Sequence, residues 1–116
     1  MNKAEATMTG SVITISDADF ETQVLQSDAP LVLAYFWASW CGPCRLVAPS
    51  VEWAAHEYSD RLKVVKIEVK PNLQSVAHCK VEGLPALRLF RQGEILDSFE
   101  GAFTRQKLVE FVENHF

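Results

Sequence analysis

Apolar residues change their spacing several times along the chain, and each change marks an expected element. Residues 31–38, LVLAYFWA, are apolar at nearly every position, which is typical of a central strand covered on both faces. Residues 62–69 alternate instead, and the alternation puts Lys66 and Glu68 on the same face of a strand. Residues 11–16 form a short β-branched run that predicts a first strand.

Helical spacing is clearest in residues 41–58, where apolar side chains recur at three- and four-residue steps. A shorter helix is expected after Ser16, which with Asp17 and Asp19 is available as an N-cap. Residues 71–79 predict another short helix, and Thr104 is suited to cap the last one. The apolar faces expected on the last two are Leu73, Val76 and Ala77, and Leu108, Phe111, Val112 and His115 or Phe116.

Two strand-like runs in residues 86–101 flank Gln92-Gly93, a pair of residues that favours a hairpin turn. These two strands are therefore expected to be antiparallel. The full order is β-α-β-α-β-α-β-β-α, which predicts an α/β fold with a mixed, mostly parallel sheet and helices on both faces.

The length of 116 residues leaves room for one domain, which we expect to span residues 12–116 after a flexible polar leader at residues 1–11. The net charge of -4 disfavours nucleic acid and anionic membranes as partners, because both require a clustered basic surface. No stretch approaches the ~20 apolar residues of a membrane span. The leader lacks the apolar core of a secretion signal, so the expected compartment is the cytosol.

The chemistry of the chain centres on Cys41 and Cys44, which stand where the apolar strand gives way to a helix. Residues three apart on a helix share a face, so the two sulfurs can meet. The unpaired N–H groups at a helix N-terminus favour a thiolate at Cys41, and the thiolate is the attacking species. Cys44 lies one turn deeper, which suits a resolving thiol.

Two other interpretations of this pair are possible. A structural zinc site needs two more ligands, and His78 and Cys79 are adjacent to each other without the usual second spacing. Two inert core cysteines are the other alternative. The position between strand and helix, with Gly-Pro between the thiols, favours redox chemistry over both. Cys79 itself is either incidental or a surface thiol open to glutathionylation or dimerisation.

The segment WCGPC at residues 40–44, preceded by FWA and followed by Pro49, resembles the active-site signature of thioredoxins. The resemblance extends from about Val12 to the C-terminus, in the strand and helix order of that family. The other positions that match are Gly83-Leu84-Pro85, which resembles the family's cis-proline loop, Gly93-Glu94 and Gly101-Ala102.

The resemblance implies that Cys41 is the nucleophile, that Cys44 resolves the mixed disulfide, and that Gly42 and Pro43 set the turn and the redox poise. Pro85, if cis, would present the backbone of Leu84 to a substrate. The implied docking patch is Trp40, Gly83, Leu84, Pro85, Gly101 and Ala102.

As a member of this family the chain would be a monomeric protein-disulfide reductase and electron carrier in cytosolic redox homeostasis. Its implied partners are disulfide-containing target proteins and a thioredoxin reductase that uses NADPH or ferredoxin. The cysteine pair carries the two electrons, so the resemblance implies neither a bound cofactor nor a metal. Two alternatives stay open: a disulfide oxidase or isomerase, and a non-catalytic subunit that binds proteins through Trp40, Leu84 and Gly101.

Tyr35 departs from the family, which usually has a buried aspartate there that accepts the proton of the second cysteine. Tyrosine stays protonated at neutral pH, so it can donate a hydrogen bond or fill space but cannot accept that proton. Lys66, the family's usual partner of the acid, is retained, and Glu68 can pair with it. We expect Glu68 or water to take the proton from Cys44. Lys70 and Ala86 also replace residue types that are common in the family.

Overall fold

The central strand of the protein is β2 (Leu31–Trp37), whose side chains are buried on both faces as its continuous apolar run predicts. The structure is a computed structural model, and it describes residues 10–116. β2 pairs in parallel with β3 (Leu62–Glu68) and antiparallel with β4 (Ala86–Arg91). β1 (Ile13–Thr14) and β5 (Glu94–Glu100) are the edge strands of the order β1-β3-β2-β4-β5. The predicted mixed sheet is confirmed, with β4 alone running against the other four strands.

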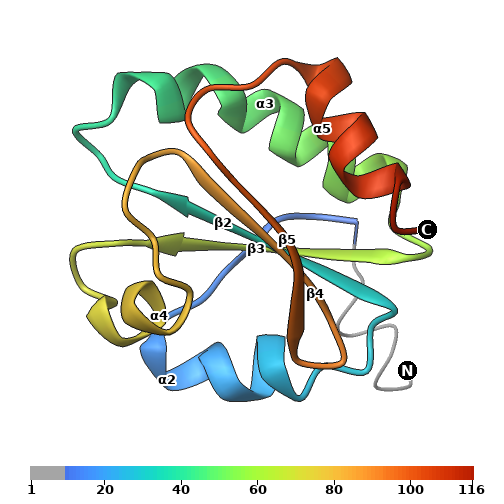
Figure 1. The fold of residues 1–116 in the computed structure, drawn as a ribbon, viewed down its shortest axis with the longest axis horizontal. Helices are drawn as coiled ribbons and strands as arrows, with labels where there is room; N and C mark the ends of the chain where they lie inside the picture. Colours follow the sequence, from blue (N-terminus) through green and yellow to red (C-terminus); the bar gives the residue numbers. More distant parts are fainter. Residues whose placement is uncertain (1–9) are drawn as a thin grey trace.

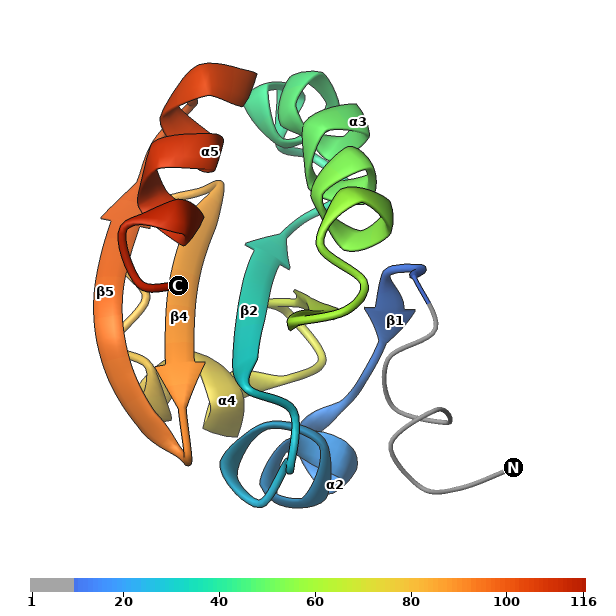
Figure 2. The same cartoon turned by 90° about the vertical axis from the view of Figure 1, so that its right-hand side faces the viewer.

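Helices cover both faces of this sheet, as predicted. In Figure 1, α3 and α5 lie over one face, whereas α2 and α4 lie over the other, and Figure 2 shows the same layers from the side. Within residues 10–116, no helix has the length and apolar character to cross a membrane. The helical bounds are α2 (Asp17–Phe20), which continues into the π-helical turn η1 (Glu21–Leu25), α3 (Gly42–Glu57), α4 (Leu73–His78) and α5 (Arg105–Glu113).

The alternation of side chains along β2 divides the core between the two layers. Leu33 and Tyr35 pack on the side of α3 and α5, whereas Ala34 and Phe36 pack on the side of α2 and α4. Tyr35 is paired in register with Lys66 of β3. This register places both side chains under α3, close to the point where β2 ends.

The structure confirms two local features predicted from the sequence, a helix cap and a hairpin turn. The Thr104 side chain caps α5 by accepting a hydrogen bond from the Lys107 N–H at 3.1 Å. Gln92 and Gly93 form the turn between β4 and β5, and both have positive φ angles. Gly93 is required there for a second reason, because a Cβ atom would lie 2.7 Å from the carbonyl oxygen of Leu25.

The prediction for α4 was wrong about which face is buried. Leu73 was expected to face the core, but 68% of its surface is exposed, and Ser75 is buried instead. The cause is Asp17 of α2, whose carboxylate accepts hydrogen bonds from the Ser75 N–H at 2.8 Å and the Ser75 hydroxyl at 2.6 Å. The first strand is also shorter than residues 11–16, and most of the expected leader lies outside the described residues.

Candidate active site

Cys41 and Cys44 form a disulfide at the junction between β2 and α3, with their Cα atoms 5.3 Å apart. Cys41 is the N-cap of α3, and Pro43 lies in the first turn, where the N–H that proline lacks has no helical partner. Both cysteines are almost fully buried, with 5% and 2% of their surface exposed. The predicted redox pair is thus assembled by one turn of helix.

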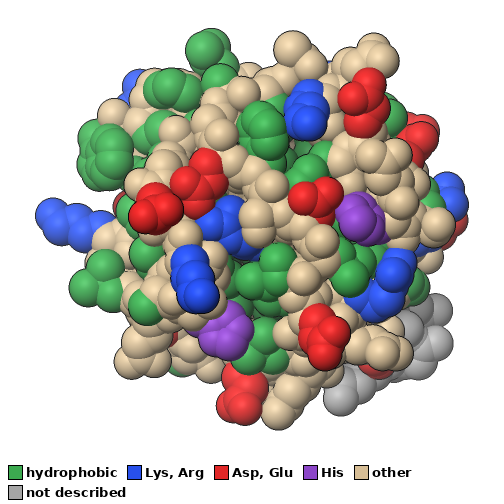
Figure 3. Space-filling view, viewed as in Figure 1, with side chains coloured by type: hydrophobic (Ala, Val, Ile, Leu, Met, Phe, Trp, Pro, Cys, Tyr) green, Lys and Arg blue, Asp and Glu red, His purple; other side chains and the backbone are tan. Residues whose placement is uncertain are grey.

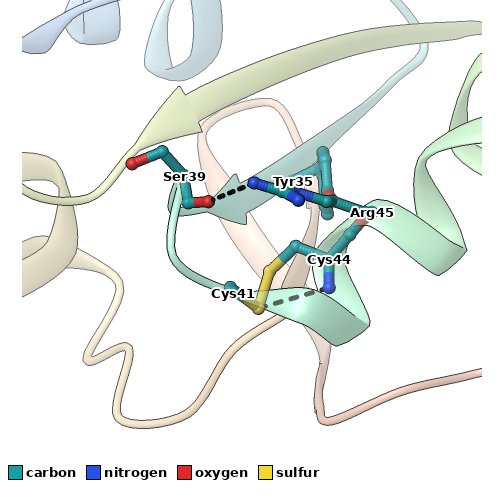
Figure 4. The surroundings of a disulfide bond; sticks show 5 residues. All are labelled: Tyr35, Ser39, Cys41, Cys44 and Arg45. Atoms are coloured by element: carbon teal, nitrogen blue, oxygen red, sulfur yellow. Dashed lines mark hydrogen bonds between the residues drawn. A yellow bond between two sulfur atoms is a disulfide. The ribbon is translucent and has the colours of Figure 1, made fainter.

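The start of α3 provides a hydrogen bond directly to the first sulfur. The Cys44 N–H donates to the Cys41 Sγ at 3.2 Å, as Figure 4 shows. In the dithiol form the same N–H favours negative charge on Cys41, together with the positive end of the helix dipole. The approach to the helix is held by the Arg45 guanidinium, which donates to the Ser39 carbonyl oxygen at 3.0 Å.

A second segment, residues 82–85, lies against the disulfide, and we call it the docking loop. Its Leu84-Pro85 peptide bond is cis, as the sequence led us to expect. Leu84 packs on the small apolar cluster of Ala38, Cys41 and Cys44. Neither the N–H nor the C=O of Leu84 forms a hydrogen bond within residues 10–116.

A groove, which we call the outer groove, runs between the disulfide and the docking loop. Trp40 and Leu73 project from its walls with 72% and 68% of their surface exposed. Figure 3 shows hydrophobic side chains gathered at the left edge of the molecule, over the end where β2 leads into α3. The residues that line the outer groove are Trp40, Cys41, Gly42, Pro43, Val69, Lys70, Leu73, Val76, Val81, Glu82 and Leu84.

The outer groove contains only part of the docking patch that the sequence predicts. Gly101 and Ala102 do not line it, although the Gly101 N–H donates to the Pro85 carbonyl oxygen at 2.8 Å and so contacts the docking loop. Leu73 was missed, because the sequence placed it in the core. Its exposure, with that of Trp40, makes the groove more apolar than expected.

Cys44 borders a different space, which we call the inner cavity. It has a volume of about 300 Å³ and is closed on the sheet side by Tyr35, Trp37 and Lys66. Its rim carries exposed residues, among them Glu52. The full lining is Val12, Tyr35, Trp37, Ala38, Ser39, Cys44, Arg45, Ala48, Val51, Glu52 and Lys66.

Tyr35 donates its hydroxyl hydrogen to the backbone carbonyl oxygen of Cys44 at 2.8 Å. Burial raises the pKa of this phenol to about 12, so it stays protonated through the neutral range. Figure 4 shows Tyr35 on β2, near the first turn of α3 that carries the disulfide. The tyrosine therefore supports the helix turn that carries Cys44, and it supplies no proton acceptor.

Lys66 does not form the ion pair with Glu68 that the sequence allowed. Within residues 10–116 Lys66 has no carboxylate within 4.0 Å, and its Nζ lies 5.7 Å from the ring centroid of Trp37. Glu68 is not among the residues that line the inner cavity. The alternation along β3 puts both residues on one face of the strand, but a shared face does not by itself bring the ammonium and the carboxylate within 4.0 Å. The Trp37 Nε1–H is buried without a hydrogen-bond partner in the described part of the chain.

Cys79 is not the surface thiol that the sequence allowed. Only 2% of its surface is exposed, and burial raises the pKa of the thiol to about 12, so it is closed to glutathionylation in the folded protein. Its neighbour His78 packs edge-on against Phe20, with ring centroids 5.3 Å apart. No cluster of metal-ligating side chains occurs within residues 10–116.

Comparison with known proteins places this arrangement in context. The sequence model of the thioredoxin family, described as thioredoxin, matches residues 11–114. A thioredoxin-like protein of Synechocystis sp. is 53% identical over 89% of this chain and 94% of its own length. The thioredoxin of Acidithiobacillus ferridurans is 39% identical over 92% and 98%, and thioredoxin 1 of Synechococcus elongatus is 40% identical over 87% and 94%.

Proposed function

Because the chain belongs to the thioredoxin family and is a thiol–disulfide oxidoreductase, we propose that Cys41 attacks the substrate disulfide and Cys44 resolves the product. One observation carries this assignment. The Cys41 sulfur lies at the helix N-terminus, accepts the Cys44 N–H and borders the outer groove, whereas Cys44 borders the inner cavity. A thiolate at Cys41 is therefore stabilised by the helix and borders the groove from which a substrate would approach.

The reaction consists of two exchanges of sulfur bonds. The Cys41 thiolate first forms a bond to one substrate sulfur, and the substrate disulfide breaks to release a thiolate that takes up a proton. The Cys44 thiolate then bonds to Cys41, and the mixed disulfide breaks to release the second substrate thiol. The substrate gains two electrons and two protons, and the protein is left with the Cys41–Cys44 disulfide seen in the structure.

The docking loop is proposed as the site that binds the peptide around the substrate disulfide. The free N–H and C=O of Leu84 support this role, because an extended peptide can pair with them as an added strand. Trp40 and Leu73 provide apolar contacts for the flanking side chains. Gly83, Pro85, Gly101 and Ala102 act by shaping and holding this loop.

The proton of Cys44 is proposed to leave through the inner cavity to solvent. Tyr35 cannot accept it, Glu68 does not line the cavity, and Glu52 lines it only as an exposed rim residue, so solvent is favoured over a buried carboxylate. Lys66, which lines the cavity beside Cys44, favours the thiolate by its charge. Gly42 and Pro43 separate the two thiols and set the redox poise of the pair.

The direction of electron flow follows from the same family membership. The chain acts as a protein-disulfide reductase. We propose that it reduces cytosolic target proteins as a monomeric electron carrier in redox homeostasis, and that a reductase using NADPH or ferredoxin reduces it in turn. A reduction potential near that of strong oxidants would favour a disulfide oxidase or isomerase instead.

Trapping of the mixed disulfide tests the roles of the two thiols. Cys44→Ser should accumulate a covalent adduct with a disulfide-containing protein, and Cys41→Ser should accumulate none. Cys79→Ser is the matched control, because this buried thiol lines neither the outer groove nor the inner cavity, and it should behave as the unmodified protein. An adduct formed by Cys41→Ser, or full turnover by the Cys41→Ser/Cys44→Ser variant, would overturn the assignment.

A further inference from the structure

Two consecutive residues hold the docking loop at its two ends: Glu100, the last residue of β5, and Gly101, in the turn that follows. The Glu100 carboxylate accepts the Gly83 N–H at 2.8 Å and the Glu82 N–H at 3.2 Å. Gly101 donates its N–H to the Pro85 carbonyl oxygen at 2.8 Å. Leu84 lies between these fixed points, with its own backbone groups unpaired within residues 10–116.

Arg88 of β4 orients the carboxylate that holds the loop. Its side chain is buried, and its Nη2 lies 2.6 Å from the Glu100 Oε2. The same guanidinium donates to the carbonyl oxygens of Cys79 at 2.8 Å, Lys80 at 3.1 Å and Leu87 at 2.9 Å. Arg88 thus joins the end of α4, the edge of the sheet and the docking loop in one network.

Gly83 has a steric role in this network. A Cβ atom at this position would lie 3.3 Å from the Glu100 Oε1, closer than an ordinary contact. Glycine therefore lets the carboxylate approach the backbone closely enough to accept its N–H. This explains the residue type at the start of the docking loop by its partner in β5.

We propose that Glu100 and Arg88 are positioning residues for substrate binding: they fix residues 82–83 so that the Leu84 backbone is preset to pair with a peptide beside Cys41. The inference rests on the proposed function of Leu84 as the peptide-binding residue. A preset strand lowers the ordering cost of binding, so its loss should raise KM for protein disulfides. A small disulfide without a peptide backbone should react equally well with or without the network.

A pair of double variants separates the positioning role from the stability of a buried ion pair. Arg88→Leu/Glu100→Gln and Arg88→Leu/Glu100→Leu both remove the two charges, so neither leaves a lone buried charge. Only the glutamine keeps an oxygen that can accept the Gly83 N–H. The measurements are KM and kcat with a protein disulfide and with bis(2-hydroxyethyl) disulfide, together with hydrogen exchange at the Gly83 amide.

We expect Arg88→Leu/Glu100→Leu to raise KM for the protein substrate roughly tenfold, as for the loss of an aligned binding group, with faster exchange at Gly83. Arg88→Leu/Glu100→Gln should raise KM by a smaller factor, because it keeps an oxygen for the Gly83 N–H but loses the guanidinium that orients it, and neither variant should change kcat for the small disulfide. Equal KM in the two double variants, despite faster Gly83 exchange in the leucine variant, would overturn the inference.

Leu84→Glu distinguishes a failure of this inference from a failure of the docking assignment. If Leu84→Glu raises KM for the protein substrate and the leucine double variant does not, positioning by Glu100 and Arg88 is wrong and docking at Leu84 stands. If neither raises KM, both are wrong. Asp97→Ala/His115→Ala is the control, because it removes another side-chain contact of β5, between the His115 Nε2 and the Asp97 Oδ2 at 3.2 Å, that does not contact the docking loop.

Discussion

The two sulfurs of the disulfide border two different spaces. The outer groove beside Cys41 is exposed and apolar, with Trp40, Leu73 and the free backbone of Leu84 along it. The inner cavity beside Cys44 is closed on the sheet side by Tyr35, Trp37 and Lys66, and the one carboxylate among its lining residues is Glu52, which is exposed at the rim. The groove is suited to bind a peptide, whereas the cavity is suited to let a proton leave.

This difference separates binding from proton transfer within one helix turn. Changes in the outer groove should alter KM and leave the titration of Cys44 unchanged. Changes in the inner cavity should alter the titration of Cys44 and leave KM for protein substrates unchanged. Variants that affect both properties together would contradict the division.

The largest effect is expected for Trp40→Ala in the outer groove. Because Trp40 is 72% exposed, its loss should change the free energy of unfolding by about 0.5 kcal/mol or less. KM for a protein disulfide should nevertheless rise about tenfold or more, since exposed tryptophans at binding sites contribute strongly to affinity. Steady-state kinetics and chemical denaturation measure the two quantities.

Ile95→Ala is the matched control for this prediction. Ile95 is also an exposed hydrophobic residue, at 41%, but it lies beside the hairpin turn at the opposite end of β5 from the docking loop. The KM of the Ile95→Ala variant for the same protein disulfide should equal that of the unmodified protein. A similar rise in KM for both variants would indicate a general loss of surface hydrophobicity and not a groove.

The next effect concerns Tyr35→Phe in the inner cavity. The substitution removes the hydrogen bond to the Cys44 carbonyl oxygen and should cost about 1 kcal/mol of stability. Turnover at pH 7 should stay within about twofold, because the protonated phenol takes no part in proton acceptance. A large loss of kcat at unchanged stability would show that the hydroxyl acts on the reacting sulfur.

The two regions should also differ in how pH affects stability. Burial raises the pKa of Tyr35 to about 12, so its contribution is present below pH 10 and is lost between about pH 10 and 12. Tyr35→Phe should therefore reduce the alkaline loss of stability. Part of the loss should remain, because burial and hydrogen bonding to Glu113 also raise the pKa of Tyr58 to about 12.

Glu100, which holds the docking loop, should affect the pH dependence of stability in the opposite direction. Burial alone would raise the pKa of Glu100, but hydrogen bonds from Arg88 and from the Glu82 and Gly83 N–H groups outweigh it and lower the pKa. Its stabilising contribution is present above pH ~4.3, the value for an unfolded chain, and is lost as the pH falls through the lower folded value. Arg88→Leu/Glu100→Gln should reduce this loss of stability at acid pH, and chemical denaturation between pH 2 and 7 would measure it. An unchanged loss of stability at acid pH would contradict its assignment to Glu100.

The smallest effects should distinguish Lys66 from Glu68. Lys66→Met should slow the resolving step a few-fold at neutral pH, because the ammonium beside the inner cavity favours the Cys44 thiolate. Glu68→Gln should change that rate by less than about twofold, since Glu68 does not line the cavity. Rapid-mixing measurement of mixed-disulfide decay would test both, and a larger effect of Glu68→Gln would restore the carboxylate as proton acceptor.

The parts of the fold that depend on local patterns could be predicted from the sequence. The buried run of β2, the turn at Gln92-Gly93 and the cap at Thr104 each follow from a few adjacent residues, and the structure confirms them. The same holds for the cysteine pair, because one helix turn brings the two sulfurs together. Features of this kind need no knowledge of distant contacts.

The Arg88–Glu100 network could not be predicted, because it depends on an irregularity of the sheet. A shift of register between Leu89 and Phe90 makes Ala86 the partner of Glu100 in β5. Without that shift the alternation of side chains would put Glu100 on the opposite face from Arg88. The exposure of Leu73 was missed for a similar reason, because it results from the contact of α4 with Asp17 of α2.

The central claim is that the proton of Cys44 leaves without a buried acid. Its most direct test is to titrate both thiols of the reduced protein, and of Tyr35→Asp, by NMR. We predict that Cys44 titrates in the unmodified protein without a coupled carboxyl group, and that Tyr35→Asp introduces a coupled second step at Cys44 while the Cys41 titration changes little. Identical curves for the two proteins would contradict the claim.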